Sequence, residues 1–435
     1  MRIALLCVLS ASLVMAGDLD HAFSSFQSNS KKIVPSDFTT ASLKYEIDTN
    51  AKTVKGLATI EFETAETGYP AFDLVPTPQN VVVDGMASDA KEIAVDGVTK
   101  FRALGKNLEA GRHTMSLQWN LSSAVFSNGA VRLGFFVGDL SDRNFFEKYG
   151  PTSFEYDHYE ASIEIALKNA RAKHVVYTNG RLRENGDNAW QIQFPKHFTA
   201  SSFYLHIANQ GYFPEKRFEV RSKEKTIPVI IYGQSLSTAE STARKVLTEL
   251  ENTYGPYGHE NLVVYVTSTG GGMEYCGATM TTTGALGHEI THSWFARGVT
   301  PAGGNSAWID EAIASWRDNG YPRYTSKPGR QNLAGFSPYR RYTTELAYSG
   351  GMRVIGHLDS YLGGMKKLLA LLWQEKQHQT ITTEEFREFL ERKSGKDLKA
   401  VFDSSVYNKG RAMMDSPEKN WHPRKYTTEE LVRFQ

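Results

Sequence analysis

The chain has 435 residues and an ordinary globular composition, with 40% hydrophobic, 12% aromatic and 22% charged residues. This composition excludes a disordered or fibrous protein, and the length predicts two or three domains. The formal net charge is only +1, so the sequence offers no general electrostatic attraction for nucleic acid or for an anionic membrane. The function is therefore expected in a localised site.

The N-terminus has the pattern of a secretory signal peptide. Arg2 precedes a short apolar run over residues 3–15, and the small residue Ala16 follows. We expect cleavage after Ala16 and an exported protein, periplasmic or secreted; the alternative is a buried N-terminal helix. The run is too short to span a bilayer, so no stable membrane insertion is expected after cleavage. Cleavage also removes Cys7 and leaves Cys276 as the single cysteine, so no internal disulfide is expected.

Residues 17–215 are predicted to form an all-β domain. Apolar and polar residues alternate over 43–47 and again over 58–62, with a polar turn at 48–50 between them. This pattern predicts a hairpin with one buried face. The same alternation recurs over 115–119.

Residues 216–410 are predicted to form a second domain, which is mixed at first and mostly helical later. Ser237 and Glu240 have the spacing of a capping box and predict a helix that begins at Ser237. Thr382 and Glu385 predict a later helix in the same way.

A possible metal site is indicated by the types and spacing of three residues, His288, Glu289 and His292. Histidines four residues apart on a helix lie on one face, so both imidazoles can bind the same ion. Zinc suits neutral imidazole, and the adjacent Glu289 is placed to act as general base. The alternative is a pair of unrelated histidines on a helix surface.

A third ligand candidate, Glu311, lies eighteen residues after His292 in a second helical stretch. Two histidines and one glutamate form a known catalytic zinc set that leaves one coordination position open. A closed structural site is more often rich in thiolates, which Cys276 alone does not supply. The sequence therefore predicts one catalytic zinc ion held by His288, His292 and Glu311.

With these residues in place, the chain resembles the aminopeptidase N family of zinc peptidases, which includes leukotriene hydrolase. The stretches 292–295, 299–300 and 308–312 resemble the family's extended zinc helix and its third-ligand helix. The resemblance implies an α+β, multidomain fold with a saddle-like, all-β N-terminal domain. A thermolysin-like, mostly helical catalytic domain follows it.

Residues 271–275 resemble the family's Gly-x-Met-Glu-Asn motif. The resemblance implies that Glu274 binds the α-amino group of the substrate and that the strand of Gly272 and Met273 pairs with its backbone. Tyr275 stands where the motif has asparagine, which leaves the geometry around Glu274 open. The sequence does not locate the glutamine or glutamate that the family's β domain contributes to the same pocket.

Tyr348, with Gly351 three residues later, matches the family's Tyr-x-x-Gly motif. The resemblance implies that the Tyr348 hydroxyl donates to the oxyanion formed on the attacked carbonyl. Tyr342 is the nearest rival for this role.

The chain ends in a polar tail, predicted over residues 411–435. We therefore expect a short form that lacks the large helical C-terminal domain of many family members. An open site for longer peptides and oligomerisation that covers the site are two hypotheses that follow, and the sequence predicts no oligomeric state.

The function predicted from these features is a zinc-dependent aminopeptidase that hydrolyses the N-terminal peptide bond of oligopeptides. A thermolysin-like zinc endopeptidase is the nearest alternative, because of Tyr275 and the short C-terminus. A catalytically dead peptide-binding protein of the same fold is the second alternative.

Overall fold

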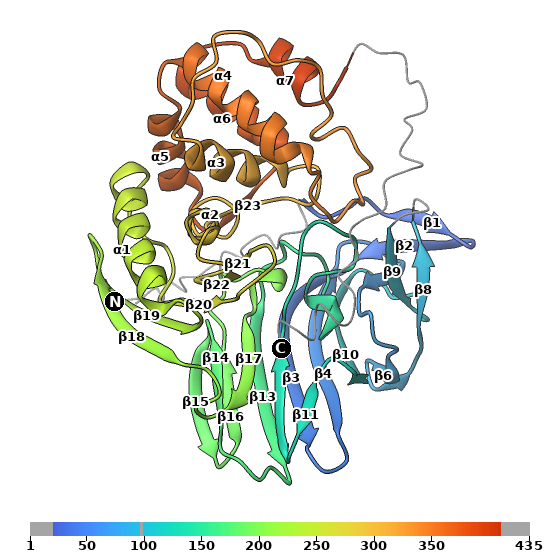
Figure 1. Ribbon diagram of the computed structural model, residues 1–435. Coiled ribbons are helices and arrows are strands. Elements are labelled where there is room, and N and C mark those ends of the chain that lie inside the picture. Colours follow the sequence, from blue (N-terminus) through green and yellow to red (C-terminus); the bar gives the residue numbers. More distant parts are fainter. Residues whose placement is uncertain (1–20, 96–98, 410–435) are drawn as a thin grey trace, which may run out of the picture.

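The computed structural model describes residues 21–95 and 99–409 of the chain. The predicted signal peptide and the predicted tail lie outside these residues. The structure confirms an α+β fold: curled sheets build the first half, and the helices gather at the other end of the molecule (Figure 1).

The largest sheet of the first half is built around the predicted hairpin. Leu43 faces Ala58 and Ile47 faces Val54 across the antiparallel pair, and these side chains are buried as the alternation predicted. The sheet has eight strands, in the order β15 (Arg181–Gly186), β16 (Ala189–Gln193), β13 (Glu160–Lys168), β3 (Asp37–Asp48), β4 (Thr53–Thr64), β10 (Gly111–Leu121), β6 (Gln79–Val83) and β7 (Met86–Ala87).

Two smaller sheets complete the first half. One has the order β1 (Phe26–Ser28), β2 (Lys31–Pro35), β5 (Tyr69–Phe72), β9 (Lys100–Leu104) and β8 (Ala90–Ala94). The other has the order β11 (Val125–Ser127), β12 (Ala130–Gly134), β17 (Leu205–Asn209) and β14 (His174–Thr178). Two short 3₁₀ turns lie between the strands, η2 (Phe146–Lys148) and η3 (Ala200–Ser202).

A five-stranded sheet begins at residue 215. Its order is β18 (Glu215–Arg221), β19 (Thr226–Gly233), β20 (Leu262–Val266), β22 (Ala278–Thr281) and β21 (Met273–Tyr275), with antiparallel strands at both edges and parallel strands between them. The helix α1 (Leu236–Thr253) packs its buried Val246, Leu247 and Leu250 into the core on this sheet.

The capping box predicted at Ser237 and Glu240 is wrong. The helix begins at Leu236 and its N-cap is Ser235, which makes no side-chain capping bond. Glu240 instead pairs with Lys216 of β18 and with Arg244 one turn later. Glu240 therefore binds two surface cations and does not cap the N-terminus of the helix, as the sequence pattern had predicted.

The remaining helices follow the sheet. They are α2 (Leu286–Thr291), α3 (Trp308–Asp318), the π-helix η4 (Ala347–Gly351), α4 (Met352–Leu362), α5 (Met365–Lys376), α6 (Thr383–Ser394) and α7 (Lys399–Ser405), with the short strands β23 (Val299–Pro301) and β24 (Gln379–Ile381) paired among them. The capping box of Thr382 and Glu385 at the start of α6 is confirmed. Among the described residues, no helix combines the length and the apolar character that crossing a membrane requires.

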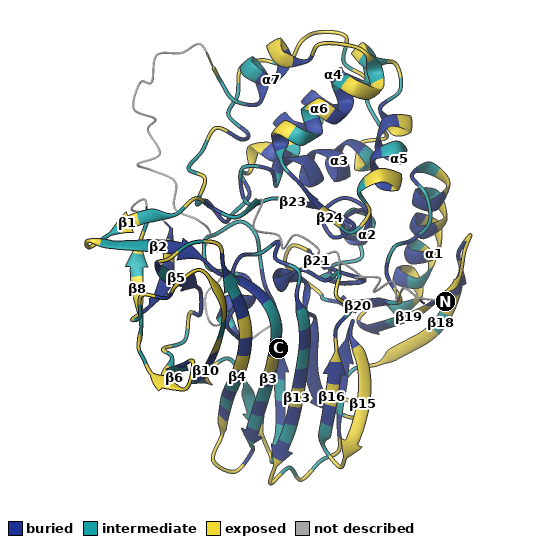
Figure 2. Cartoon of the chain, turned by 180° about the vertical axis from the view of Figure 1, so that it is seen from behind, coloured by how far each residue is buried: buried dark blue, intermediate teal, exposed yellow. Residues whose placement is uncertain are grey.

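The edge strand β21 is packed into the core of the first half, and Figure 2 shows it buried between the sheets and α2. The Tyr275 hydroxyl donates to the carbonyl of Phe135 at 3.2 Å and accepts from the amide of Val137 at 3.1 Å. The residue that departs from the family motif therefore anchors β21 to the first half of the chain.

A cluster of histidines lies where the two halves meet. The rings of His197 and His378 are 3.9 Å apart between centroids, and His259 is 5.9 Å from each of them. Burial lowers the pKa of His197 to about 4 and that of His378 to about 3, and it holds the pKa of His259 well below its usual range.

Because of this histidine cluster, we expect the folded chain to lose stability as the pH falls. Below about pH 6.5 the unfolded chain binds protons that the folded histidines do not, so the free energy of unfolding falls as the pH drops towards 4. Each histidine contributes at most about 1.4 kcal/mol per pH unit in that window. We expect a double variant, His197→Gln with His378→Gln, to lose less thermal stability between pH 7.5 and pH 5 than the wild type. Equal losses of melting temperature would contradict this.

Candidate metal centre and substrate pocket

The structure brings the three predicted ligands together. His288 Nε2 is 2.9 Å and His292 Nε2 is 3.6 Å from the same oxygen, Glu311 Oε2. His288 lies on α2, His292 is its C-cap residue, and Glu311 lies in the first turn of α3. His292 and Glu311 are buried, and His288 is partly exposed.

The other nitrogen of each imidazole is held by a second group. His288 Nδ1 donates to Asp318 Oδ2 at 2.7 Å, and His292 Nδ1 donates to the carbonyl of Phe295 at 3.1 Å. These bonds fix the tautomers, so both Nε2 atoms face the same point. Asp318 lies at the C-terminal end of α3 and is a contributor that the sequence reasoning missed.

The donor set fits a zinc ion. Ligand atoms bonded at about 2.0–2.1 Å to one tetrahedral zinc lie about 3.3 Å apart, close to the separations found between these three side chains. Without an ion, burial lowers the pKa of His288, but hydrogen bonds to Asp318 and Glu311 raise it to about 10 overall. Zinc binding would therefore displace protons held between these groups.

Glu289 is buried beside the ligands. Burial raises the pKa of its carboxyl group to about 8, with the negative charge of Glu274 adding to the rise. Gly272 lies directly against it, because a Cβ at that position would be 1.9 Å from Glu289 Oε1. The glycine that the sequence motif highlighted therefore leaves the space that the Glu289 carboxylate occupies.

Glu274 lies on β21, between Met273 and Tyr275, which are both buried. One ligand atom each from Glu274, His292 and Asp310 lie within 4.8 Å of one another. These three could also hold an ion, but Glu274 Oε1 already accepts from Arg297 Nη2 at 3.0 Å. A resident guanidinium disfavours a second metal cation at the same carboxylate.

Tyr348 reaches the ligands from η4. Its hydroxyl donates to Glu311 Oε1 at 2.8 Å, and its ring is stacked 6.1 Å from that of His288. Burial raises the pKa of Tyr348, so the phenol stays protonated and can donate. Tyr342 lines the neighbouring pocket, and its carbonyl accepts from Arg340. The geometry therefore favours Tyr348 as the hydroxyl group at the metal centre.

Two further carboxylates face this region and were missed from the sequence. Asp139, from the loop after β12, has a pKa raised to about 7 by burial and by the charges of Glu311 and Glu274. Burial also raises the pKa of Asp310, which lies in the first turn of α3. Asp139 comes from the first half, as does Glu155 of the same pocket, and only the folded chain shows Asp139 in one pocket with Glu274.

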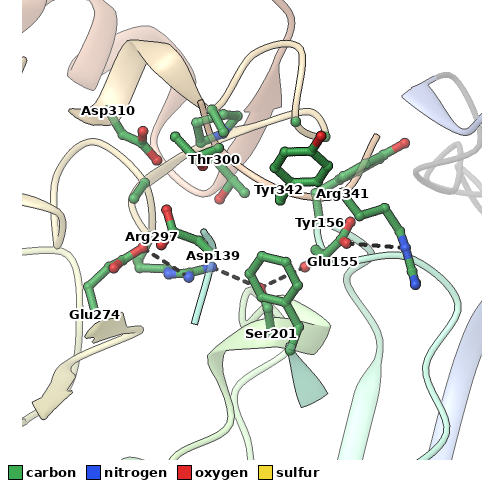
Figure 3. A pocket seen from close by; sticks show the side chains of 17 residues that line it. Asp139, Glu155, Tyr156, Ser201, Glu274, Arg297, Thr300, Asp310, Arg341 and Tyr342 are labelled. Carbon is green, nitrogen blue, oxygen red and sulfur yellow. Dashed lines mark hydrogen bonds and ion pairs between the residues drawn. The ribbon is translucent and has the colours of Figure 1, made fainter. Parts of the chain in front are cut away.

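A pocket of about 50 Å³ extends from Glu274 and Asp310 (Figure 3). Arg297 lies beside Glu274 and Asp139 in this view, with Ser201 below it and Tyr156 on the other side of the pocket, near Arg341. Arg297 is the fourth residue missed from the sequence. It lies between the stretches 292–295 and 299–300 of the family resemblance, but no spacing rule indicates where its side chain points.

The hydrogen bond from His288 Nδ1 to Asp318 leads to a prediction about the affinity for zinc. In the variant Asp318→Ala, the Nδ1 bond is lost and the imidazole is free to turn. We expect the dissociation constant for zinc to rise by about 10–100-fold, as measured by competition with a chromogenic chelator.

The variant Asp89→Ala is a matched control, because it removes an exposed carboxylate from the opposite half of the chain. Wild-type affinity in Asp318→Ala would show that the tautomer of His288 does not depend on this carboxylate.

Known proteins can be compared with this geometry. The sequence is 23% identical to an aminopeptidase N of Streptomyces lividans in an alignment of 319 residues that covers 63% of this chain and 36% of that protein. The chain therefore spans about a third of the length of this curated relative. No protein-family model matches the chain.

Solved structures share the fold. Yeast leukotriene A4 hydrolase superposes with a TM-score of 0.63 at 14% identity, over 88% of this chain and 69% of the yeast chain. An M1 zinc metallopeptidase of Deinococcus radiodurans gives a TM-score of 0.62 at 16% identity, over 90% of this chain and 97% of that chain. A mutant of the Deinococcus enzyme has been solved with a Tyr-Ser-Ala substrate.

The sequence match links the chain to an aminopeptidase N, and the superpositions show the fold of M1 zinc metallopeptidases. Together they confirm that this chain resembles the aminopeptidase N family of zinc metallopeptidases.

Proposed function

We propose that the protein is a zinc-dependent aminopeptidase that removes the first residue of oligopeptides. The observation that carries the proposal is the placement of Glu274 beside His292 of the metal centre, with Asp139 in the same pocket as Glu274. A peptide carbonyl at the metal would place its terminal ammonium among carboxylates, which favour a cation. We also infer that residues 216–410 act as a thermolysin-like catalytic domain on a saddle-like β domain.

His288, His292 and Glu311 would hold one zinc ion, which when bound supplies a Lewis acid that activates water and polarises the scissile carbonyl. Glu289 accepts the proton of the attacking water. Burial raises the pKa of this carboxyl group, which makes it a stronger base for the water proton, and the protonated group can then donate to the leaving amine.

The substrate ammonium would bind Glu274 Oε2, because Oε1 is occupied by Arg297. An ionised carboxylate has lone pairs for several donors, so one oxygen can keep Arg297 while the other accepts from the substrate. Asp139 offers a second carboxylate that lines the same pocket. Both groups select for a free N-terminus.

Tyr348 would stabilise the oxyanion of the tetrahedral intermediate. In the free protein its hydroxyl donates to Glu311, a ligand, so it already lies at the edge of the site where the carbonyl oxygen would develop charge. Its buried, protonated phenol suits a donor role.

One observation favours a thermolysin-like endopeptidase as the second candidate. The ion pair between Arg297 and Glu274 neutralises part of the negative charge that an ammonium requires. An internal peptide segment, which carries no ammonium, would then be accepted more readily.

The role of Glu289 is tested by Glu289→Gln. The variant keeps the size and the hydrogen-bonding capacity of the side chain but cannot accept the proton, so we expect kcat to fall by about 10²–10⁴-fold while zinc content stays at one ion per chain. Zinc by mass spectrometry and single-turnover hydrolysis of a chromogenic amide measure the two quantities. Turnover within a few-fold of the wild type would exclude Glu289 as the base.

The exopeptidase assignment is tested with paired peptides that differ only in N-acetylation. The wild type should cleave the free peptide at least 100-fold faster, and Glu274→Gln should reduce that ratio mainly through KM. Glutamine is preferred to alanine here because it leaves an acceptor for Arg297. Equal cleavage of both peptides by the wild type supports the endopeptidase instead.

A further inference from the structure

The loop that carries Asp139 is held in place by a buried ion network. This loop runs over residues 138–144 and is closed at its base, where the amide of Gly138 donates to the carbonyl of Asn144 at 2.8 Å. Asp139 directly follows Gly138, and Arg143 lies at the other end of the loop. The position of the Asp139 carboxylate therefore depends on what holds Arg143.

Asp73 is the centre of this network. It directly follows β5, and its side chain is fully buried. Arg143 donates to both of its carboxylate oxygens, from Nη2 to Oδ1 at 2.8 Å and from Nε to Oδ2 at 2.9 Å. A paired contact between a planar guanidinium and a carboxylate fixes orientation as well as distance. The far end of the Asp139 loop is thus fixed to the end of β5.

The same carboxylate also holds a segment of the second half of the chain that bonds to this loop. Arg341 Nη2 donates to Asp73 Oδ2 at 2.8 Å, and Arg341 Nε lies 3.4 Å from Asp142 of the loop. Two residues later, the amide of Thr343 donates to the carbonyl of Asp139 at 2.7 Å. The second arginine therefore ties Asp139 to Asp73 through a separate part of the chain.

The network is not explained by the chemistry of the pocket itself. Arg341 lines the pocket, but its side chain lies at the end away from Glu274 and only 4% of it is exposed (Figure 3). For buried ion pairs, desolvation offsets much of the attraction between the charges. The network is therefore better explained by the arrangement that it fixes than by added stability, and the acidic group in that arrangement that lies in one pocket with Glu274 is Asp139.

We propose that Asp73 is a positioning residue, which sets the place of Asp139 through Arg143 and Arg341 and thereby strengthens binding of the substrate's terminal ammonium. This inference rests on the proposed function, because it requires an ammonium in the pocket. Asp73 does not itself line the pocket. If the loop shifts, the Asp139 carboxylate moves away from the ammonium, while the metal ligands on α2 and α3 stay in place.

The experiment measures kcat and KM of the zinc-loaded full chain on a peptide with a free N-terminus. The wild type is compared with Asp73→Asn, Asp139→Asn and the double variant. We expect each single variant to raise KM about 10-fold and to keep kcat within about 3-fold of the wild type. The double variant should raise KM no further than Asp139→Asn alone, because both changes act on one contact. Independent effects would multiply to about 100-fold.

A matched control separates positioning from stability. Asp73→Asn leaves two buried arginines with a weaker partner, so its melting temperature should fall. Glu251→Gln also converts a buried carboxylate to an amide, at a site on α1 where it accepts from Ser222 and from the amide of Tyr257. We expect Glu251→Gln to lower the melting temperature and to keep the wild-type KM.

A second variant serves if Asp73→Asn does not fold. Arg143→Lys keeps the positive charge but cannot make the paired contact with Asp73, so KM should rise in the same way. Its effect should also disappear in the Asp139→Asn background.

The outcomes are distinct. A wild-type KM in Asp73→Asn or in Asp139→Asn, or effects on KM that multiply in the double variant, overturns the inference and leaves the aminopeptidase standing. A loss confined to melting temperature or to kcat also overturns it, because it marks a structural role. A wild type that cleaves free and N-acetylated peptides equally well overturns the proposed function itself.

Discussion

The metal centre depends on one contact between two helices, α2 and α3. His288 lies between Glu311 at the start of α3 and Asp318 at its end, with 2.9 Å to one carboxylate and 2.7 Å to the other. The length of α3 therefore sets where the imidazole can lie, and the His292 tautomer is fixed separately by the carbonyl of Phe295. A shift of either helix along the other would separate the ligands and the buried base together.

The substrate side of the site depends on a different constraint, the attachment of β21 to the first half of the chain. Tyr275 bonds both Phe135 and Val137 from the strand that carries Glu274, and the loop after these residues carries Asp139. The same bonds thus set the position of the two carboxylates across the pocket. Adjacent residues of a strand point to opposite faces, so Tyr275 can anchor the strand while Glu274 faces the site.

The sequence patterns predicted those parts of the structure that are set by residues close together in the chain. The hairpin of β3 and β4, the capping box of Thr382 and the three ligands all follow from side-chain periodicity or from spacing along a helix. Asp318 could have been suspected, because it lies two turns after Glu311 on the same helix. The Ser237 capping box failed because Glu240 has cationic neighbours from β18 and from its own next turn.

Asp139 and Arg297 could not be found in that way, because their roles arise from the fold. Asp139 is more than a hundred residues from the ligands and meets the site through the bonds of Tyr275 to Phe135 and Val137. Arg297 meets the site through an unusual φ at Ala296. Asp139 and Arg297 together change the charge that surrounds Glu274 of the sequence motif. An isolated carboxylate would attract any ammonium, whereas Glu274 shares its charge with the buried guanidinium of Arg297, so the pocket holds both signs of charge before any ligand binds.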